Sequence, residues 1–266
     1  MVAVGDIGVC GEENDEATAE LVVGDSRATV LVLGDNVYNE GLKEEYESCY
    51  APAWGRFKDR TRPVPGNHEY LHFPDAAGYF DYFGDAAGRR GLGYYSFDLG
   101  AWHLIALNSN CDAELVGGCG AGSAQERWLR GDLRSSGKGC TLAYWHHPRF
   151  SSGTAHGSDE RTAAFWQALY DAGADVVLGG HEHNYQRFAP QAPSGEVDEE
   201  RGLREFVVGT GGATPVGLGE ELRATEIQNT GTFGILRLTL FEGAYDWEFE
   251  PAAGVEFTDH GSGRCH

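Results

Sequence analysis

The segment Thr29-Val30-Leu31-Val32-Leu33-Gly34-Asp35-Asn36-Val37-Tyr38 decides the fold class, because a strand-forming run ends in a glycine and a group of polar side chains. A short apolar run closed by a turn signal predicts a buried β-strand. Val2–Val4, followed by Gly5 and Asp6, repeats the arrangement. Both runs therefore predict strands whose carboxyl ends carry candidate functional side chains.

Further strands and helices follow along the chain. Apolar runs predict buried strands at 102–107, 141–145 and 175–178, and helical spacing predicts helices at 124–133 and 160–172. This alternation of strands and helices is typical of the α/β class. The length of 266 residues and a hydrophobic content of 41% predict one domain over residues 1–266.

The last third of the chain has a different pattern. Strands are predicted at 205–208, 234–240 and 245–249 with little helix between them, and we expect them to complete a second sheet. Residues 191–204 contain Pro, Ser, Gly and acidic side chains without an apolar period, which predicts a surface loop.

Charge excludes several classes of partner. Acidic residues outnumber basic residues 41 to 20, and the resulting net charge of −21 repels nucleic acids and anionic membranes. No apolar run approaches the roughly 18 to 20 residues that cross a bilayer, so no membrane partner is expected. The same charge would repel a phosphate substrate, so an enzyme acting on phosphate needs metal ions or arginines to reverse the potential locally.

The chain has six cysteines and no CxxC pair, which favours disulfides over a zinc site. Cys111 and Cys119 flank a short glycine-rich loop and form the simplest predicted bridge. Two further bridges are expected, one joining the loops after the first two strands and one joining a strand start to the C-terminal tail. These are Cys10 with Cys49, and Cys140 with Cys265.

Disulfides imply an oxidising compartment, so we expect a secreted or periplasmic protein. No basic segment or long apolar core precedes Val2–Val4, and we therefore expect the leader to be absent from this chain. The alternative is a cytosolic protein with six free thiols.

Five short blocks stand at or just after predicted strand ends, where sites form in open α/β sheets. They are Gly5-Asp6-Ile7-Gly8, Gly34-Asp35-Asn36-Val37-Tyr38, Gly66-Asn67-His68-Glu69, His146-His147-Pro148 and Gly180-His181-Glu182-His183. Each block alone has a structural explanation as a turn or a buried histidine. Together they supply nitrogen and oxygen donors without thiolate, which suits iron, zinc or manganese. Two ions require a bridging ligand, and Asp35 is the natural candidate.

The order and spacing of these blocks resemble the calcineurin-like metallophosphoesterases from Asp6 to His183. The resemblance implies an α/β fold with a two-sheet β-sandwich flanked by helices. Most members have a histidine where this chain has Gly8, whereas Tyr38 follows Asp35 by three residues. Gly8 with Tyr38 is similar to the purple acid phosphatases, in a short single-domain form. A tyrosine ligand that binds as phenolate in acid implies ferric iron.

The resemblance also implies a role for each donor. It assigns Asp6, Tyr38 and His183 to Fe(III), and it assigns Asp35 to both ions. The divalent ion, which is Fe, Zn or Mn, would be held by Asn67, His146 and His181. Because the family ligand lies two residues before a proline, His146 is expected to bind and His147 to face elsewhere.

Two further histidines are expected to act on the substrate. His68 lies beside Asn67 and matches a substrate-side histidine of the family, and His156 in the loop 151–158 matches another more loosely. Either side chain would orient the phosphate or protonate the leaving oxygen. The alternative for His156 is a solvated loop histidine.

The resemblance implies hydrolysis of small phosphate monoesters at acidic pH, with a metal-activated hydroxide attacking phosphorus. The ligand set does not encode the leaving group, which loops such as 113–122 and 151–159 would select, so a phosphodiesterase or nucleotidase is an alternative. A second alternative is a catalytically silent binding protein that keeps the fold, although all seven candidate donors are present. A third alternative is redox chemistry at a pair of iron ions, as a side activity.

Overall fold

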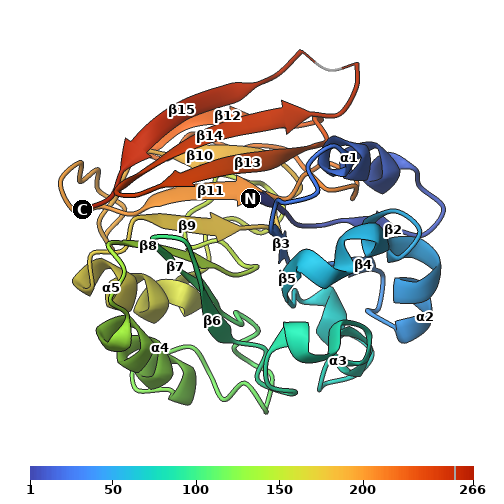
Figure 1. Cartoon of the computed structure of the whole chain (residues 1–266), viewed down its shortest axis with the longest axis horizontal. Coiled ribbons are helices and arrows are strands. Elements are labelled where there is room, and N and C mark those ends of the chain that lie inside the picture. The colour runs from blue at the N-terminus through green and yellow to red at the C-terminus, as the bar shows by residue number, and fades with distance from the viewer. Residues whose placement is uncertain (255) are drawn as a thin grey trace.

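Two mixed β-sheets face each other in the computed structural model, which describes residues 1–254 and 256–266 (Figure 1). The first sheet has the strand order β15-β14-β13-β1-β3-β5, and the second has the order β12-β10-β11-β9-β8-β7-β6. Strands β2 and β4 form a separate parallel pair. The predicted α/β sandwich with flanking helices is confirmed.

Within the described residues, the first sheet has six strands and the second has seven. The first sheet comprises β1 (Val2–Val4), β3 (Val30–Leu33), β5 (Thr61–Val64), β13 (Gly234–Phe241), β14 (Ala244–Pro251) and β15 (Asp259–Arg264). The second comprises β6 (Tyr95–Leu99), β7 (Trp102–Ala106), β8 (Cys140–Tyr144), β9 (Val176–Gly179), β10 (Tyr185–Phe188), β11 (Arg204–Val208) and β12 (Thr225–Asn229). The small pair is β2 (Gly8–Val9) with β4 (Val37–Tyr38). The α-helices are α1 (Asn14–Val23), α2 (Lys43–Glu45), α3 (Ala77–Phe83), α4 (Ala124–Ser135) and α5 (Ala163–Asp171).

The inner strands are apolar on both faces because each face meets a different core. In β1 and β3, Ala3 and Leu31 point into the space between the two sheets, whereas Val2 and Val30 point outward. Successive side chains of a strand alternate between faces, so one continuous apolar run fills two cores. This alternation explains why these segments lack an apolar-polar period in the sequence.

Helices cover the outer face of each sheet (Figure 1). Helices α4 and α5 pack on the second sheet, where Leu129 and Phe165 share a core with Ala143 of β8. Helices α1 and α3 contribute to the core on the outer face of the first sheet, for example through Val22 and Phe80. The parallel central strands of both sheets are thereby shielded from water on both sides.

The expectation that the strands of the last third together complete a second sheet is correct for β11 and wrong for β13 and β14. Strands β13, β14 and β15 extend the first sheet, and Leu236 of β13 pairs antiparallel with Ala3 of β1. Strands β10, β11 and β12 extend the second sheet instead. The outcome is physically favourable because each group covers an open edge next to the parallel strands. The expected loop 191–204 is also folded back, since Gln191 forms bridges with Val197 and Leu203.

All six cysteines are joined in the three expected pairs. The Cα atoms are 4.9 Å apart in Cys10–Cys49, 5.1 Å in Cys111–Cys119 and 5.5 Å in Cys140–Cys265. The last bridge spans 125 residues and ties the start of β8 to the end of the chain after β15. Bridges that close long loops stabilise most in the chain-entropy account, at about 3 to 5 kcal/mol each.

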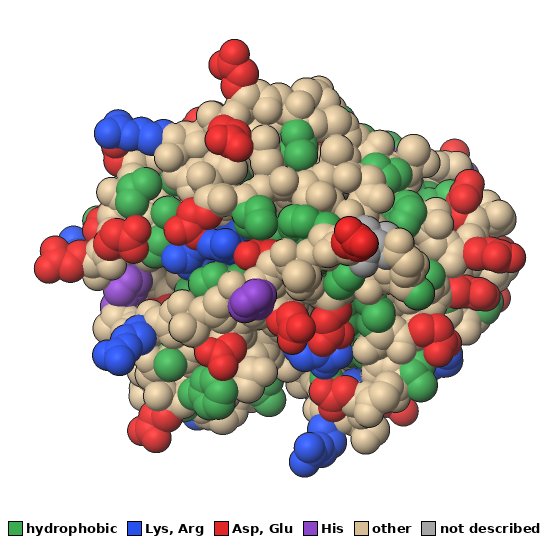
Figure 2. All heavy atoms as spheres, turned by 90° about the horizontal axis from the view of Figure 1, so that it is seen from above, with side chains coloured by type: hydrophobic (Ala, Val, Ile, Leu, Met, Phe, Trp, Pro, Cys, Tyr) green, Lys and Arg blue, Asp and Glu red, His purple; other side chains and the backbone are tan. Residues whose placement is uncertain are grey.

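The surface carries the acidic excess of the composition. Figure 2 shows acidic side chains spread over one face of the molecule, with fewer basic side chains between them. Within the described residues, none of the helices has the length and apolar character that crossing a bilayer requires.

Candidate metal centre

The candidate donors converge because the strands that precede them run parallel. Asp6, Asp35 and Asn67 follow β1, β3 and β5, which are parallel neighbours in the first sheet. His146 and His181 follow β8 and β9, which are parallel neighbours in the second. The two sheets therefore present their carboxyl ends to one shared space, where sites form in open α/β sheets.

The backbone at three of these donors is held in the left-handed region. Asp6, Asp35 and His181 have φ values of 60°, 45° and 70°, and only Ala76 joins them among the described non-glycine residues. This conformation costs roughly 1 to 2 kcal/mol for a residue with a side chain. The surrounding fold therefore stabilises a backbone shape that aims these side chains and that their local sequence does not favour.

Two glycines allow the ligand loops to approach each other. Gly34 has a φ of 88°, and a Cβ placed there would lie 2.6 Å from Nδ1 of His146. A Cβ at Gly66 would lie 2.1 Å from Oδ1 of Asp35. Any larger residue would push the neighbouring side chain away from the site.

Tyr38 lies at the centre of one group of donors. Its hydroxyl is 3.0 Å from Oδ1 of Asp6, 3.3 Å from Oδ2 of Asp35 and 3.1 Å from Nε2 of His183. The side chain is 5% exposed, and β4 places it beside the loop that contains Asp6. The Tyr38 hydroxyl thus points into the space shared by Asp6 of the first donor block and His183 of the last.

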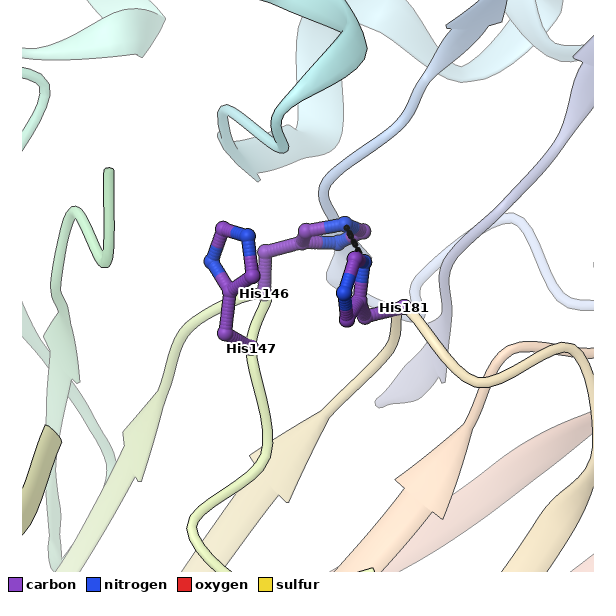
Figure 3. Close-up of side chains that lie close together, drawn as sticks. All are labelled: His146, His147 and His181. Atoms are coloured by element: carbon purple, nitrogen blue, oxygen red, sulfur yellow. Dashed lines mark hydrogen bonds between the residues drawn. The ribbon is translucent and has the colours of Figure 1, made fainter. Parts of the chain in front are cut away.

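A second group of donors surrounds His146. Its Nε2 atom is 3.0 Å from Oδ1 of Asn67, 3.1 Å from Nδ1 of His181 and 3.3 Å from Oδ2 of Asp35. Figure 3 shows the rings of His146 and His181 turned toward each other. Oδ2 of Asp35 lies 3.3 Å from the Tyr38 hydroxyl and 3.3 Å from Nε2 of His146. Asp35 therefore belongs to both groups of donors.

His147 is held differently from its neighbour. Its Nδ1 atom is 2.8 Å from the Ser109 hydroxyl, which also accepts the His147 backbone N–H. Burial and the adjacent His146 lower the pKa of His147 to about 3, so its ring is neutral. Its ring lies close enough to His146 and His181 to count among possible ligands by distance alone, but only His146 contacts Asn67 and Asp35. The contacts favour His146 as the donor.

Carbonyl groups fix which ring nitrogen faces the site. Nδ1 of His146 lies 2.9 Å from the Leu33 carbonyl oxygen, and Nδ1 of His183 lies 2.8 Å from that of Thr214. A carbonyl only accepts, so Nδ1 carries the proton in both rings and Nε2 remains for a metal ion. Such outer partners are typical of metal-binding histidines.

The two proposed substrate-side histidines lie at the rim. His68 places Nδ1 2.5 Å from the Asn39 carbonyl oxygen and Nε2 3.9 Å from Oδ2 of Asp35, with 24% of its side chain exposed. His156 is exposed and stacks on the ring of His181 at a centroid distance of 3.9 Å. The loop that carries His156 thus reaches the site.

Two buried glutamates position the site loops, and the sequence reasoning assigned neither of them a role. Glu69 accepts the backbone N–H groups of Asp35, Asn36 and Gly66 and the hydroxyl of Tyr46. Glu69 and the second glutamate, Glu182, both stand inside the donor blocks, within two residues of a candidate metal ligand, and this position in the sequence was the signal for their role.

Glu182 has the corresponding role in the second sheet. Its Oε1 atom accepts the N–H groups of His156 and Gly157 at 2.6 Å and 2.5 Å. Its Oε2 atom is buried without a hydrogen-bond partner among the described residues. The carboxylate therefore connects the block of His181 and His183 to the loop that carries His156.

The concentration of acidic groups changes proton affinities at the site. Burial lowers the pKa of His146, but Asp35 and Asp6 raise it to about 9 overall. Burial also opposes the charged form of His183, yet Asp6 raises its pKa to about 9. Burial and Asp6 raise the pKa of Tyr38 well above its ordinary value. Metal ions must therefore displace protons from these side chains, which makes metal affinity dependent on pH.

The donor set fits a pair of metal ions. Its nitrogen and oxygen atoms form two groups that share Asp35, and no thiol lies among them, because all six cysteines are in disulfides. Iron, zinc and manganese accept such donors. The arrangement can hold two cations close together and bind phosphate oxygens between them.

Known proteins share the pattern. Residues 1–185 match the family described as calcineurin-like phosphoesterase. Purple acid phosphatase 15 of Arabidopsis thaliana is 28% identical over 222 residues, which cover 70% of this chain and 40% of the relative. Purple acid phosphatase 21 of the same plant is 33% identical over 168 residues, which cover 54% of this chain and 37% of the relative. The chain thus spans about two fifths of the length of these relatives.

A solved structure supports the fold. A purple acid phosphatase from yellow lupin (Lupinus luteus) seeds superposes with a TM-score of 0.80 at 18% identity, and the match covers 98% of this chain and 52% of that chain. The dinuclear metal site and phosphoester hydrolysis are typical of the matched family, and the donor groups described above fit them. This chain therefore belongs to the calcineurin-like phosphoesterase family and is related, within that family, to the purple acid phosphatases.

Proposed function

We propose that this chain hydrolyses phosphate monoesters in acid with a ferric ion and a divalent ion, and that residues 1–266 form one catalytic domain. The observation that carries the proposal is the position of Tyr38, whose hydroxyl lies 3.0 to 3.3 Å from Asp6, Asp35 and His183. A phenol with a raised pKa binds as phenolate only when a strongly Lewis-acidic cation replaces its proton.

Asp6, Tyr38 and His183 would hold the ferric ion, because they surround one end of the site. The other end, formed by Asn67, His146 and His181, would hold Fe, Zn or Mn as the divalent ion. Asp35 would bind both ions, because its carboxylate lies 3.3 Å from the Tyr38 hydroxyl and 3.3 Å from Nε2 of His146. When bound, the cations supply an ionised water for attack on phosphorus and positive charge for the phosphate oxygens.

His68 is placed to hold a phosphate oxygen or deliver a proton. Its Nδ1–H donates to the Asn39 carbonyl, so Nε2 is the nitrogen that faces the site. Nε2 is therefore the atom that would exchange a proton with a leaving oxygen. His156, on the other side, would reach the same oxygen from its position over His181.

The proposed location is outside the cell or in the periplasm. All six cysteines are paired, and disulfides persist in oxidising compartments. The proposed substrates are small phosphate esters, because the net charge of −21 opposes binding of polyanions.

Metal analysis combined with visible absorption tests the proposal. The iron-loaded protein should be purple or pink through charge transfer from the Tyr38 phenolate, and Tyr38→Phe should lose the band. Tyr94→Phe is the matched control, because Tyr94 packs against Trp128 away from the donors and should keep the band. A colourless iron-loaded wild type would contradict the tyrosine-bound ferric ion. Parallel assays of a monoester and a diester would decide the preferred substrate.

A further inference from the structure

A cavity of about 480 Å³ opens beside the candidate metal centre. Two site residues, Asn67 and His147, form part of its wall. A substrate whose phosphate lies between the donors therefore has room for its ester group on this side. The inference below rests on the proposed phosphatase function and concerns the identity of that group.

One wall of the cavity is apolar and exposed. It contains Tyr70, Leu71 and Pro74, which follow the Asn67 block in the sequence. Leu71 is 60% exposed and lines the same cavity as Asn67. The Tyr70 hydroxyl accepts the Asn108 side-chain amide at 2.7 Å, which fixes the ring within the wall. This surface can shield an apolar group from water without rearrangement.

The cavity lining also carries charges that disfavour an anion. Arg161 donates to the carboxylates of Asp112 and Asp159, so its positive charge is already paired. Glu114 adds a further exposed carboxylate to the wall. An ester group with its own negative charge would meet net negative potential there.

The loop that carries two of these charges, Asp112 and Glu114, is held in place at both ends. The Cys111–Cys119 bridge closes the loop that contains Asp112 and Glu114. The Asn110 side chain, at the start of that loop, donates to the Pro65 carbonyl oxygen at 3.2 Å. A wall fixed in this way selects ligands by shape and charge at little ordering cost.

We infer that this cavity binds the alcohol portion of the ester, and that the favoured substrates are monoesters of uncharged apolar alcohols that carry an aromatic ring. Burying a ring of this size should raise kcat/KM about 10- to 100-fold, which corresponds to roughly 1.4 to 2.8 kcal/mol. A carboxylate on the same ring removes most of this gain, because it faces Asp112 and Glu114.

Three alkyl esters of similar intrinsic reactivity test the inference: ethyl phosphate, phenethyl phosphate and para-carboxyphenethyl phosphate. The metal-loaded protein should hydrolyse phenethyl phosphate with a kcat/KM about 10- to 100-fold above that for ethyl phosphate. The carboxylated ester should fall back toward ethyl phosphate. Leu71→Ser should reduce the phenethyl-to-ethyl ratio, and Glu114→Gln should raise the relative rate on the carboxylated ester.

Phe73→Ser is the matched control, because Phe73 is also exposed in this segment but does not line the cavity. It should leave the phenethyl-to-ethyl ratio unchanged. Equal kcat/KM for ethyl and phenethyl phosphate in the wild type would overturn the inference and leave the phosphatase function intact. No hydrolysis of any of the three esters by the metal-loaded protein would overturn both.

Discussion

The two sheets contribute to the site in different ways. In the first, Asp6, Asp35 and Tyr38 are 0%, 1% and 5% exposed, and their backbone is fixed by the strands that precede them. In the second, His181 is only partly buried, and the neighbouring His156 stands in an exposed loop. Both halves bury donors, since His146 of the second half is 0% exposed, and they differ in what reaches the substrate: His68 in the helical turn after β5 for the first half, and the exposed loop of His156 for the second.

The glutamates behind each half reflect the same difference. Glu69 uses both oxygens for four donors from the first half. Glu182 uses one oxygen for two donors of the His156 loop. A fully used carboxylate constrains its surroundings more than a half-used one. Glu69 therefore ties the donor loops of the first half to one another, whereas Glu182 ties the His156 loop to the block of His181 and His183.

The largest effect is expected from losing a donor on either side. Asn67→Ala in the first half and His146→Ala or His181→Ala in the second should each reduce kcat at least ~100-fold, because the divalent ion loses a ligand. Metal content measured by elemental analysis should fall as well. His147→Ala should cost much less, and a larger loss from His147→Ala than from His146→Ala would show that the neighbouring ring is the donor.

His156→Ala should act on the substrate alone. Metal content should stay intact, because the other seven donors account for two ions. The rate on an alkyl phosphate should fall by ~10²-fold or more, since an alkoxide leaving group needs a proton. A nitrophenyl phosphate should be little affected, because its leaving group departs unaided. An equal loss on both esters would indicate phosphate binding, and no loss on either would return His156 to a solvated loop residue.

Glu182→Ala should give a smaller loss with the same dependence on the leaving group. The variant frees the N–H groups of His156 and Gly157 from their acceptor, so the loop becomes less ordered. We expect ~10-fold on the alkyl ester. In a double variant with His156→Ala, the Glu182 effect should largely disappear, because both act through one side chain. Fully additive losses would contradict this positioning role.

The smallest effect on rate is expected at Glu205, which accepts the N–H groups of Arg149 and Phe150 behind the second half. Burial raises its pKa to about 8 from an ordinary value of 4.5. Between these two pH values the folded protein keeps the Glu205 proton that the unfolded chain releases. The contribution of this proton to the free energy of unfolding is therefore complete below pH 4.5 and is lost as the pH rises through about 8.

Glu205→Gln should remove this part of the pH dependence, on the order of a few kcal/mol between acid and neutral pH. Denaturant unfolding of both proteins at several pH values, with the disulfides intact, provides the measurement. An unchanged pH dependence in the variant would show that Glu205 is ionised in the folded protein.

The sequence by itself determined the parts of the structure that depend on local pattern. Apolar runs such as Val30–Leu33 predicted strands buried on both faces, and the polar residues after them predicted a shared edge. The three disulfide pairs followed from the positions of the cysteines relative to strand ends. The departure at Gly8 and Tyr38 indicated the purple acid phosphatase relationship, because a donor type is visible in one dimension.

Only the tertiary structure decided the relations between distant segments. It divided the strands of the last third between two sheets, because edge pairing depends on which edges are open in three dimensions. It distinguished His146 from His147 through contacts with Asn67 and Ser109, since adjacent side chains look equivalent in a sequence. It gave Glu182 a partner 26 residues away, because a buried carboxylate binds whichever backbone N–H groups the fold brings to it.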